Sequence, residues 1–467
     1  MKSFPLPEEV KEFGKVFQEH GHHLYVVGGS IRDALLGVPN HDYDFTTDAI
    51  PQEVQRLFRR VIPTGIEHGT VTVLFHGQKY EVTTFRTEGA YLDMRHPSSV
   101  TFVPDLAEDL SRRDFTINAF AADCISGQII DLYHGREDLK DGVIRAIGEP
   151  RKRFQEDALR ILRALRFAAK LDFTIEPETF KAMGELKENL SHVSEERIHD
   201  ELTKMLCSPH PAKGLALADQ SGVLDVLLPD LANGRGIQQN GQHHDTVLAH
   251  CIHTCQIAAD HGYSQYVREA ALLHDIGKCR TVEYHPDGNT YHRHDLVGAE
   301  ITRTILRNLK ASNEEVDTVS HLVSQHMFTY TPEWSDAAVR RFIVRVGKDH
   351  LDDLFRLRIC DVIATMTDQG EAENQTIQLA AYRSIQSLEQ RIQSILEQGD
   401  ALSLKDLKIN GNDVMALGVP KGPGVKEMLE YLLSCVMEDP AQNERDRLIA
   451  LASAHLEASN EATSKPS

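Results

Sequence analysis

The sequence has few cysteines and no long apolar runs. Seven cysteines are scattered through 467 residues, an odd number without the spacing of a disulfide framework, which predicts free thiols and a reducing, cytoplasmic compartment. No apolar run approaches the ~20 residues of a membrane-spanning helix. The opening segment MKSFPLPEEVKEF is too polar for a secretory signal. We therefore expect neither membrane association nor a disulfide-stabilised secreted domain.

Positive charge is outnumbered by negative charge. The formal net charge is −20, from 50 lysines and arginines against 70 aspartates and glutamates, which argues against nucleic-acid binding over the whole surface. Binding is decided by local patches, however. One basic strip lies in residues 145–170 and contains Arg145, Arg151, Lys152, Arg153, Arg160, Arg163, Arg166 and Lys170. An acidic protein with such a strip can still hold RNA there.

Two patterns of apolar residues divide the chain. In the first ~140 residues, the segments LYVV, YDFTT, TVTVLF and YEVTTFR are rich in β-branched residues and predict strands. The segment SIRDALLG predicts a helix that has Ser30 as N-cap and ends at Gly37. From Phe154 onward, apolar residues recur at helical spacing. The predicted fold class is an α+β head with a small mixed sheet, followed by all-α regions.

Changes in composition suggest six parts. They are a head (1–140), a helical neck (141–210), a helical connector (211–241), a histidine-rich domain (242–369), a helical tail (370–456) and a disordered end (457–467).

Two acidic residues in the segment GGSIRDALLGVPNHDYDFTT alternate along a predicted strand. Asp42 and Asp44 should therefore leave the same face of that strand. Such a pair can hold two Mg²⁺ ions, which lie about 3.5–4 Å apart in two-metal sites. Glu81, on a strand expected nearby, is the candidate for a third carboxylate. The three residues predict a catalytic metal site.

The same segment begins with a glycine corner. Gly28 and Gly29 end a predicted strand at the start of a helix, where backbone N–H groups can face an anion. Arg32 follows one turn later and can add a charged fork to phosphates. Alone, two glycines are more often a turn, and two alternating aspartates a solvated strand end. Together, in this order, they favour a site for a nucleoside triphosphate.

These motifs resemble the head of the DNA polymerase β nucleotidyltransferase superfamily. More narrowly, they resemble the class II tRNA nucleotidyltransferases (CCA-adding enzymes) and the bacterial poly(A) polymerases. The likeness continues through RRDFTINAF (112–120), RFQEDALRILRALRFAAKLDF (153–173) and SEERIHDEL (194–202), in the order of the family. It implies Mg²⁺-dependent nucleotidyl transfer at Asp42 and Asp44, with tRNA, ATP and CTP as partners.

The resemblance implies that Asp157 and Arg160 read the incoming base. Their chemistry agrees, because residues at i and i+3 share a helix face, aspartate only accepts hydrogen bonds and arginine only donates them. Adenine and cytosine each present an amino donor beside a ring-nitrogen acceptor, whereas guanine and uracil reverse that pattern. Without the head motif, an ordinary surface ion pair would be the better explanation.

The resemblance assigns further nucleotide contacts. It implies that Arg113 and Asp114 contact phosphate and ribose, that Asn118 supports them, and that Arg163 and Arg166 lie on phosphates of nucleotide or tRNA. For these two arginines alone, a solvated helix face is the simpler explanation.

Two segments bear on which nucleotides are added. The polar segment 87–111 reads as a loop, and the resemblance implies a mobile loop here that is needed for the final A. The segment GIEHGTVTV (65–73) is more similar to CCA-adding enzymes than to poly(A) polymerases, which carry an arginine-rich element nearby. The alternative of an enzyme that adds only the terminal A remains open.

A histidine-rich block runs from residue 243 to residue 326, and an aspartate follows it. The adjacent His-Asp pair within this pattern has the spacing of an HD-type metal phosphohydrolase, with imidazoles and carboxylates that suit a transition metal or Mn²⁺. The candidate ligands are His250, His274, Asp275, His294, His326 and Asp361. Asp275 could bridge two ions, but the set could also be a stabilising relic. The metal and substrate are not indicated.

The resulting prediction is a tRNA nucleotidyltransferase that adds CCA, or at least the terminal A. Three alternatives are kept: a poly(A) polymerase, an HD phosphohydrolase whose head only binds nucleotide, and a non-enzymatic RNA-binding protein. The sequence does not indicate the oligomeric state.

Overall fold

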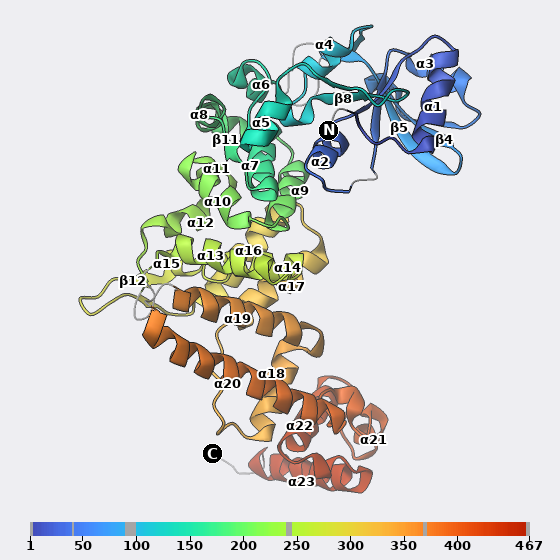
Figure 1. The fold of residues 1–467 in the computed structure, drawn as a ribbon. Helices are drawn as coiled ribbons and strands as arrows, with labels where there is room; N and C mark the ends of the chain where they lie inside the picture. Colours follow the sequence, from blue (N-terminus) through green and yellow to red (C-terminus); the bar gives the residue numbers. More distant parts are fainter. Residues whose placement is uncertain (1–2, 40–41, 89–99, 240–244, 368–370, 464–467) are drawn as a thin grey trace. The chain divides into compact units, whose positions relative to one another are not determined.

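The computed structural model describes residues 3–39, 42–88, 100–239, 245–367 and 371–463. The chain forms two compact units, which are described separately (Figure 1). Unit 1 comprises Met1–Ile237, Ala259–Arg268 and Arg303–Val316. Unit 2 comprises Gln238–Ala258, Glu269–Thr302 and Asp317–Ser467. The predicted domain boundaries at residues 242 and 369 lie outside the described residues.

A seven-stranded sheet organises the start of unit 1, with strand order β3-β4-β5-β2-β1-β8-β9. The strands are β1 (Leu24–Val27), β2 (Asp44–Thr47), β3 (Val61–Gly65), β4 (Thr70–Phe75), β5 (Gln78–Thr84), β8 (Phe120–Asp123) and β9 (Ile129–Asp131). Strands β2 and β5 are parallel, and the other paired strands are antiparallel. The sheet is thus mixed, as predicted.

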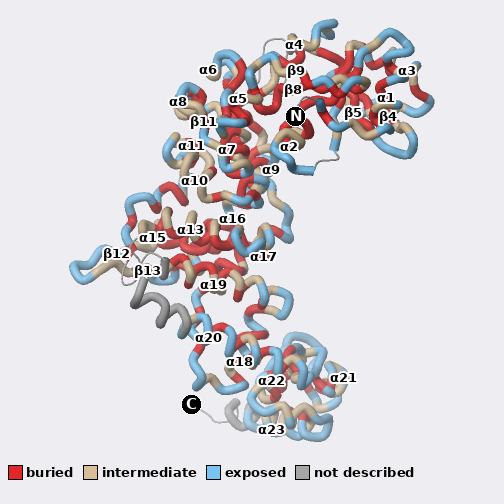
Figure 2. The backbone as a smooth tube through the Cα atoms, viewed as in Figure 1, coloured by how far each residue is buried: buried red, intermediate tan, exposed pale blue. Residues whose placement is uncertain are grey.

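An aromatic core covers one face of this sheet. Helix α1 (Glu8–Glu19) buries Phe13 and Phe17 completely, and the ring of Phe13 lies 5.4 Å from that of Phe45 on β2. Phe58, after helix α3 (Pro51–Leu57), joins the same cluster. In Figure 2 the backbone around β5 and β8 is coloured red, as buried. Because β2 commits Phe45 to this core, its neighbour Asp44 must project to the other face.

Helices complete unit 1. They include α2 (Gly29–Leu35), α4 (Leu106–Ser111), α5 (Gly135–Asp141), α6 (Pro150–Glu156), α7 (Leu159–Leu171), α8 (Pro177–Leu186), α9 (Glu195–Leu206), α10 (Pro211–Gln220), α11 (Val223–Leu227) and α12 (Pro229–Ala232). Helix α7 buries Leu162 and Leu165 on one side, while its arginines occupy another. This helix carries the second half of the predicted basic strip, which comprises Arg160, Arg163, Arg166 and Lys170.

The described residues of unit 2 are helical apart from one short hairpin of β12 (Val282–Glu283) and β13 (Thr290–Tyr291). Its helical segments belong to α13 (Val247–Asp260), α14 (Gln265–Leu273), α15 (Lys278–Thr281), α16 (His294–Asn308), α17 (Asn313–Gln325), α18 (Asp336–Val346), α19 (Leu351–Thr367), α20 (Glu371–Glu397), α21 (Gly411–Ala416), α22 (Pro423–Glu438) and α23 (Arg445–Thr463). The predicted fold class, an α+β head followed by helices, is confirmed. Among the described residues, no helix has the length and apolar character needed to cross a membrane.

Some local predictions were wrong. Helix α2 begins at Gly29, so Ser30 is its second residue and not its N-cap. Strand β2 begins at Asp44, so Asp42 precedes the strand. The predicted continuous helix around Asp157 is interrupted there, because Asp157 has an extended backbone between α6 and α7.

Two segments predicted to lack regular structure contain it. Within residues 87–111, β6 (Arg86–Glu88) pairs with β7 (Val100–Phe102), and α4 follows; residues 89–99 lie outside the described residues. Helix α23 continues to Thr463, so the disorder predicted from residue 457 was wrong up to that point. The alanines and glutamates there favour helix intrinsically.

Candidate functional site

Acidic side chains gather at the start of β2. The parallel pairing of β2 and β5 sets Asp44 directly beside Glu81, and Phe45 beside Val82. Phe45 and Val82 are buried in the core, whereas Asp44 and Glu81 are exposed on the opposite face. Desolvation raises the pKa of Asp44, the nearby charge of Asp42 raises it further, and Arg113 opposes both. The three predicted catalytic carboxylates are thus neighbours.

The glycine corner lies where the backbone of β1 turns into α2. Gly28 has a φ of 79°, in the left-handed region that favours glycine. A Cβ atom there would lie 3.3 Å from Nη1 of Arg113, and one on Gly29 would lie 3.3 Å from Nη2 of Arg32. The two glycines therefore allow two guanidinium groups to approach the backbone closely.

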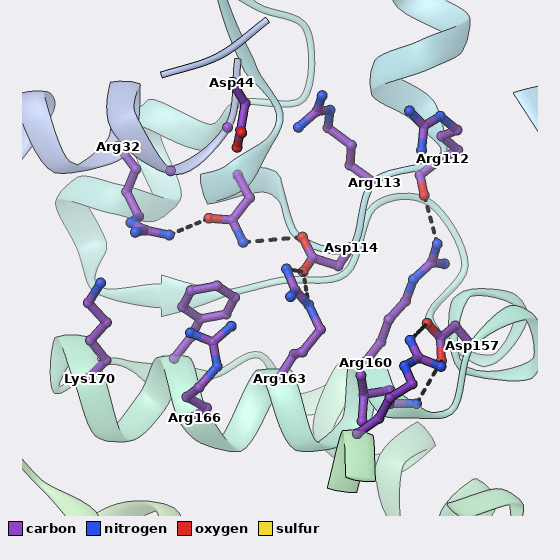
Figure 3. A pocket seen from close by; sticks show the side chains of 16 residues that line it. Arg32, Asp44, Arg112, Arg113, Asp114, Asp157, Arg160, Arg163, Arg166 and Lys170 are labelled. Atoms are coloured by element: carbon purple, nitrogen blue, oxygen red, sulfur yellow. Dashed lines mark hydrogen bonds and ion pairs between the residues drawn. The ribbon is translucent and has the colours of Figure 1, made fainter. Parts of the chain in front are cut away.

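A buried hydrogen-bond network holds four further predicted site residues, which are Arg32, Asn118, Asp114 and Arg163. Arg32 donates from Nη1 to Oδ1 of Asn118 (2.6 Å), and Asn118 donates to Oδ1 of Asp114 (3.1 Å). Arg163 on α7 donates from Nε to Oδ2 of Asp114 (2.7 Å) (Figure 3). Burial alone would raise the pKa of Asp114, but the charge of Arg163, together with the hydrogen bonds from Arg163, Asn118 and the backbone of Phe115, outweighs burial and lowers it. The network joins the sheet region to α7.

These groups surround an open cavity of about 420 Å³. The lining residues predicted from the sequence are Gly28, Gly29, Arg32, Asp44, Arg113, Asp114, Asn118, Asp157, Arg160, Arg163 and Arg166. Asp42 and Glu81 are not among the lining residues, although both lie beside Asp44. The lining is predominantly cationic, as a polyphosphate ligand requires.

Asp157 and Arg160 both line the cavity, but they do not share a helix face. Asp157 accepts a hydrogen bond from the backbone N–H of Leu159 (3.0 Å), the first residue of α7. Its other carboxylate oxygen accepts from Nη2 of Arg197 (2.8 Å). Arg160 donates to Glu156 (2.8 Å) and to the carbonyl of Arg112 (2.8 Å). Each side chain is therefore oriented by a different neighbour.

The sequence analysis missed several lining residues, which are Arg112, Leu159, Phe167, Lys170 and Arg197. Arg112 and Arg197 lie in motifs that were recognised, so their positions could have been inferred. Phe167 is a buried residue that also lines the cavity. Its ring lies 5.1 Å from Cζ of Arg32 and 4.3 Å from that of Arg166, distances typical of cation–π contacts.

The histidine-rich block forms a second, closed cluster within unit 2. Nε2 of His250 and Nε2 of His274 lie 3.8 and 3.4 Å from Oδ2 of Asp275. Nε2 of His294 and Nε2 of His326 lie 3.3 and 3.6 Å from Oδ1 of the same carboxylate. Asp361 approaches Nε2 of His250 to 3.1 Å. All six predicted ligands are therefore brought together, around Asp275.

Three of these histidines are held with one nitrogen aimed at the centre. Nδ1 of His274, His294 and His326 lies 2.7–2.9 Å from a backbone carbonyl, so that nitrogen carries the proton. Their Nε2 atoms are buried and have no hydrogen-bond partner among the described residues. This is the arrangement expected of metal-ligating imidazoles with an oriented outer nitrogen.

The charges in this centre also favour a bound cation. Burial lowers the pKa of His274, but Asp275 and Asp361 outweigh it and raise the pKa to about 10. The centre thus attracts positive charge, and a divalent ion would supply it. The ammonium group of Lys278 supplies part of this positive charge, with Nζ 2.6 Å from Oδ2 of Asp275 and 2.5 Å from Oε1 of Gln239. The residues fit a metal site.

Comparison with known proteins first identifies the class. Residues 24–145 match the family model described as "Poly A polymerase head domain". Residues 172–234 match "Probable RNA and SrmB- binding site of polymerase A", and residues 295–452 match "tRNA nucleotidyltransferase domain 2". The sheet thus belongs to a nucleotidyltransferase head, which supplies the part of the cavity lining between Gly28 and Asn118.

Similar proteins identify the family. The crystal structure of Bacillus stearothermophilus CCA-adding enzyme in complex with CTP is 30% identical, aligns over 97% of this chain and 98% of that one, and gives a TM-score of 0.72. CCA-adding enzymes of Streptococcus pneumoniae (strain G54) and Enterococcus faecalis are 50% and 53% identical over 50% and 46% of this chain. These matches span 56% and 54% of the relatives' lengths, about half of each. The chain belongs to the CCA-adding enzyme family, whose nucleotidyltransferase chemistry depends on divalent metal.

Proposed function

We propose that this protein adds C, C and A, or at least the terminal A, to the 3′ end of tRNA, using CTP and ATP. The observation that carries the proposal is the register of Asp44 with Glu81 beside a cavity lined by guanidinium groups. A carboxylate edge suits divalent cations, and the guanidinium groups suit a triphosphate. The similar Bacillus stearothermophilus enzyme is a complex with CTP.

In the proposed reaction, the 3′-hydroxyl of tRNA attacks the α-phosphorus of the nucleotide, a phosphodiester bond forms, and pyrophosphate leaves. Asp42 and Asp44, with Glu81 beside them, would hold Mg²⁺, since hard oxygen donors suit that ion. The ions would neutralise the triphosphate and acidify the attacking hydroxyl. Catalysis is then mainly positioning and charge stabilisation.

The chain's own residues would orient the nucleotide. Arg32 and Arg163 are fixed by the buried network through Asn118 and Asp114, so their remaining N–H groups are preorganised for phosphate. We propose that Arg113, Asp114 and Arg166 contribute to the phosphate and ribose contacts, with Gly28 and Gly29 allowing close approach.

Base selection is proposed to rest on Asp157 and Arg160. Arg197 holds Asp157 and Glu156 holds Arg160, so the acceptor and the donor are fixed separately at the cavity. An acceptor beside a donor matches adenine and cytosine and leaves groups of guanine and uracil unpaired, which is costly in a desolvated site.

The test is nucleotide addition to tRNAs that end before, within and after the CC sequence, with CTP and ATP supplied singly and together. The proposal expects C, C and one A, or one A on tRNA ending in CC, followed by a stop. Long A tails would instead identify a poly(A) polymerase. Binding of tRNA without pyrophosphate release would identify a non-enzymatic RNA-binding protein.

The rest of the chain is proposed to bind tRNA by shape and backbone, since every tRNA must be accepted. We retain the head, neck, connector, histidine-rich domain and tail boundaries of the sequence analysis as proposals. The tRNA substrate and seven free cysteines support a cytoplasmic site of action.

A second function is proposed for the histidine centre: metal-dependent hydrolysis of a phosphoester. It is favoured by the buried Nε2 atoms of His274, His294 and His326, which surround Asp275 without hydrogen-bond partners among the described residues. The purified protein should contain metal and should hydrolyse bis-p-nitrophenyl phosphate. Metal without hydrolysis would mean a structural centre, and absence of both after metal addition would refute the proposal.

A further inference from the structure

Most cations of the nucleotide cavity already have a carboxylate partner. Each of its arginines lies within 4 Å of an acidic side chain. The pairs are Arg32–Asp33, Arg112–Asp109, Arg113–Asp109, Arg160–Glu156, Arg163–Asp114, Arg166–Glu201 and Arg197–Asp157. These guanidinium groups are held in place, and their charge is partly neutralised, before any ligand binds.

Lys170 differs from these arginines. It lines the same cavity but is exposed, and among the described residues it has no ion pair or hydrogen bond from its ammonium group. It lies on the last turn of α7, and Figure 3 shows its side chain directed toward Arg32. Burial and the charges of Arg32 and Arg166 lower its pKa, while Asp33 opposes them. Lys170 is thus an uncommitted cation beside two others.

The position of Lys170 along α7 identifies what it can reach. Arg160 begins the cavity face of this helix, and Lys170 follows ten residues later, a rise of about 15 Å. Figure 3 shows Asp157 and Arg160 at one end of the cavity and Arg32 and Lys170 at the other. The base and the terminal phosphates of an extended nucleoside triphosphate lie at its two ends. If the first end reads the base, the second receives phosphate.

We infer that Lys170 is a positioning residue that binds the terminal phosphates of the incoming nucleotide, and hence the departing pyrophosphate. The inference rests on the proposed function. The lysine needs an anionic partner in a cavity whose other cations are partnered, and an ammonium group binds phosphate as a mobile point charge. The α-phosphate would lie beside Asp44, at the start of β2. The β- and γ-phosphates would then be the groups that Lys170 binds.

The test compares Lys170→Met with wild type for binding of CTP and of CMP, measured by equilibrium competition. We expect CTP to bind roughly 10-fold more weakly to Lys170→Met, the loss typical of one charge-assisted contact, and CMP to bind unchanged. Lys170→Arg should retain most of the CTP affinity. Lys181→Met, which removes an exposed lysine of α8 that does not line the cavity, is the matched control.

Steady-state kinetics provide a second readout. For Lys170→Met, the KM for CTP and ATP should rise while the KM for tRNA stays constant, and inhibition by pyrophosphate should weaken. An equal loss of CTP and CMP, or a rise confined to the KM for tRNA, would overturn the inference; the latter would assign Lys170 to the tRNA backbone. If wild-type protein binds no CTP, the proposed function itself fails, which is a distinguishable result.

Discussion

The nucleotide cavity of unit 1 and the histidine centre of unit 2 differ in charge and in access. The cavity is open, and arginines and Lys170 dominate its lining. The centre is closed, with His250, His274 and His326 almost fully buried around Asp275. The first arrangement suits a large anion that enters and leaves, and the second suits small cations that stay bound. One chain therefore places carboxylates in two environments: on the exposed face of a sheet and within a buried cluster of histidines.

The largest expected effect separates the two sites. Asp44→Asn removes one carboxylate from the proposed Mg²⁺ site without changing its shape. Nucleotide addition should fall by at least about 10³-fold, because charge stabilisation worth several kcal/mol is lost. The rate of addition to tRNA ending in CC measures this. The metal content of the histidine centre, determined on the same sample, should be unchanged, and its loss would show that the sites are not independent.

His326→Ala is the reciprocal change. It removes a buried imidazole that we propose as a metal ligand, so metal affinity at the histidine centre should fall by about 100-fold or more. Titration of the metal-free protein with Mn²⁺ or Co²⁺ measures the change. Nucleotide addition serves as the control and should keep its wild-type rate. Unchanged metal affinity would contradict the assignment of this histidine.

A smaller effect of opposite sign is expected for Lys278→Met. The ammonium group lies 2.6 Å from Oδ2 of Asp275, the oxygen that also faces His250 and His274. An entering metal ion must compete with that charge, so its removal should tighten metal binding by about 10-fold. The same titration tests this, with Lys405→Met as an exposed control. Weaker binding would mean that Lys278 orients Asp275 for the metal.

The smallest effect concerns a histidine outside the centre. Nε2 of His199 lies 2.7 Å from Oε1 of Glu315, and this contact raises the pKa of His199 despite burial. The pair's contribution is fully present below the unfolded-state pKa of about 6.5 and is lost as pH rises through the higher folded-state pKa. Urea unfolding between pH 5 and 9 should show this loss, about 1 kcal/mol or less. His199→Gln should flatten the dependence; an unchanged profile would contradict it.

The site was predicted best where several short motifs supported the same interpretation. The strands that carry Asp44 and Glu81 and the gathering of six metal-ligand candidates followed from pattern and spacing, and the structure places these residues as neighbours. It failed where side chains redirect the backbone. Asp157 has an extended backbone, and its carboxylate accepts a hydrogen bond from the N–H of Leu159, so the predicted helix is interrupted there.

Contacts between side chains far apart in the sequence could not be predicted either. Nothing in the local sequence indicates that Arg197 pairs with Asp157 across 40 positions, or that Phe167 lies beneath Arg32 and Arg166. Such partners depend on how α7 and α9 pack together, and helical periodicity gives which face is apolar but not which charged groups meet across it.

The most direct test of the central claim is a crystal structure with CTP and Mg²⁺. The account predicts the triphosphate between Arg32 and the Asp44 edge, with metal ions on Asp42 and Asp44 and the cytosine against Asp157 and Arg160. A nucleotide bound elsewhere, with the Asp42 and Asp44 side chains free of metal and directed apart, would contradict it.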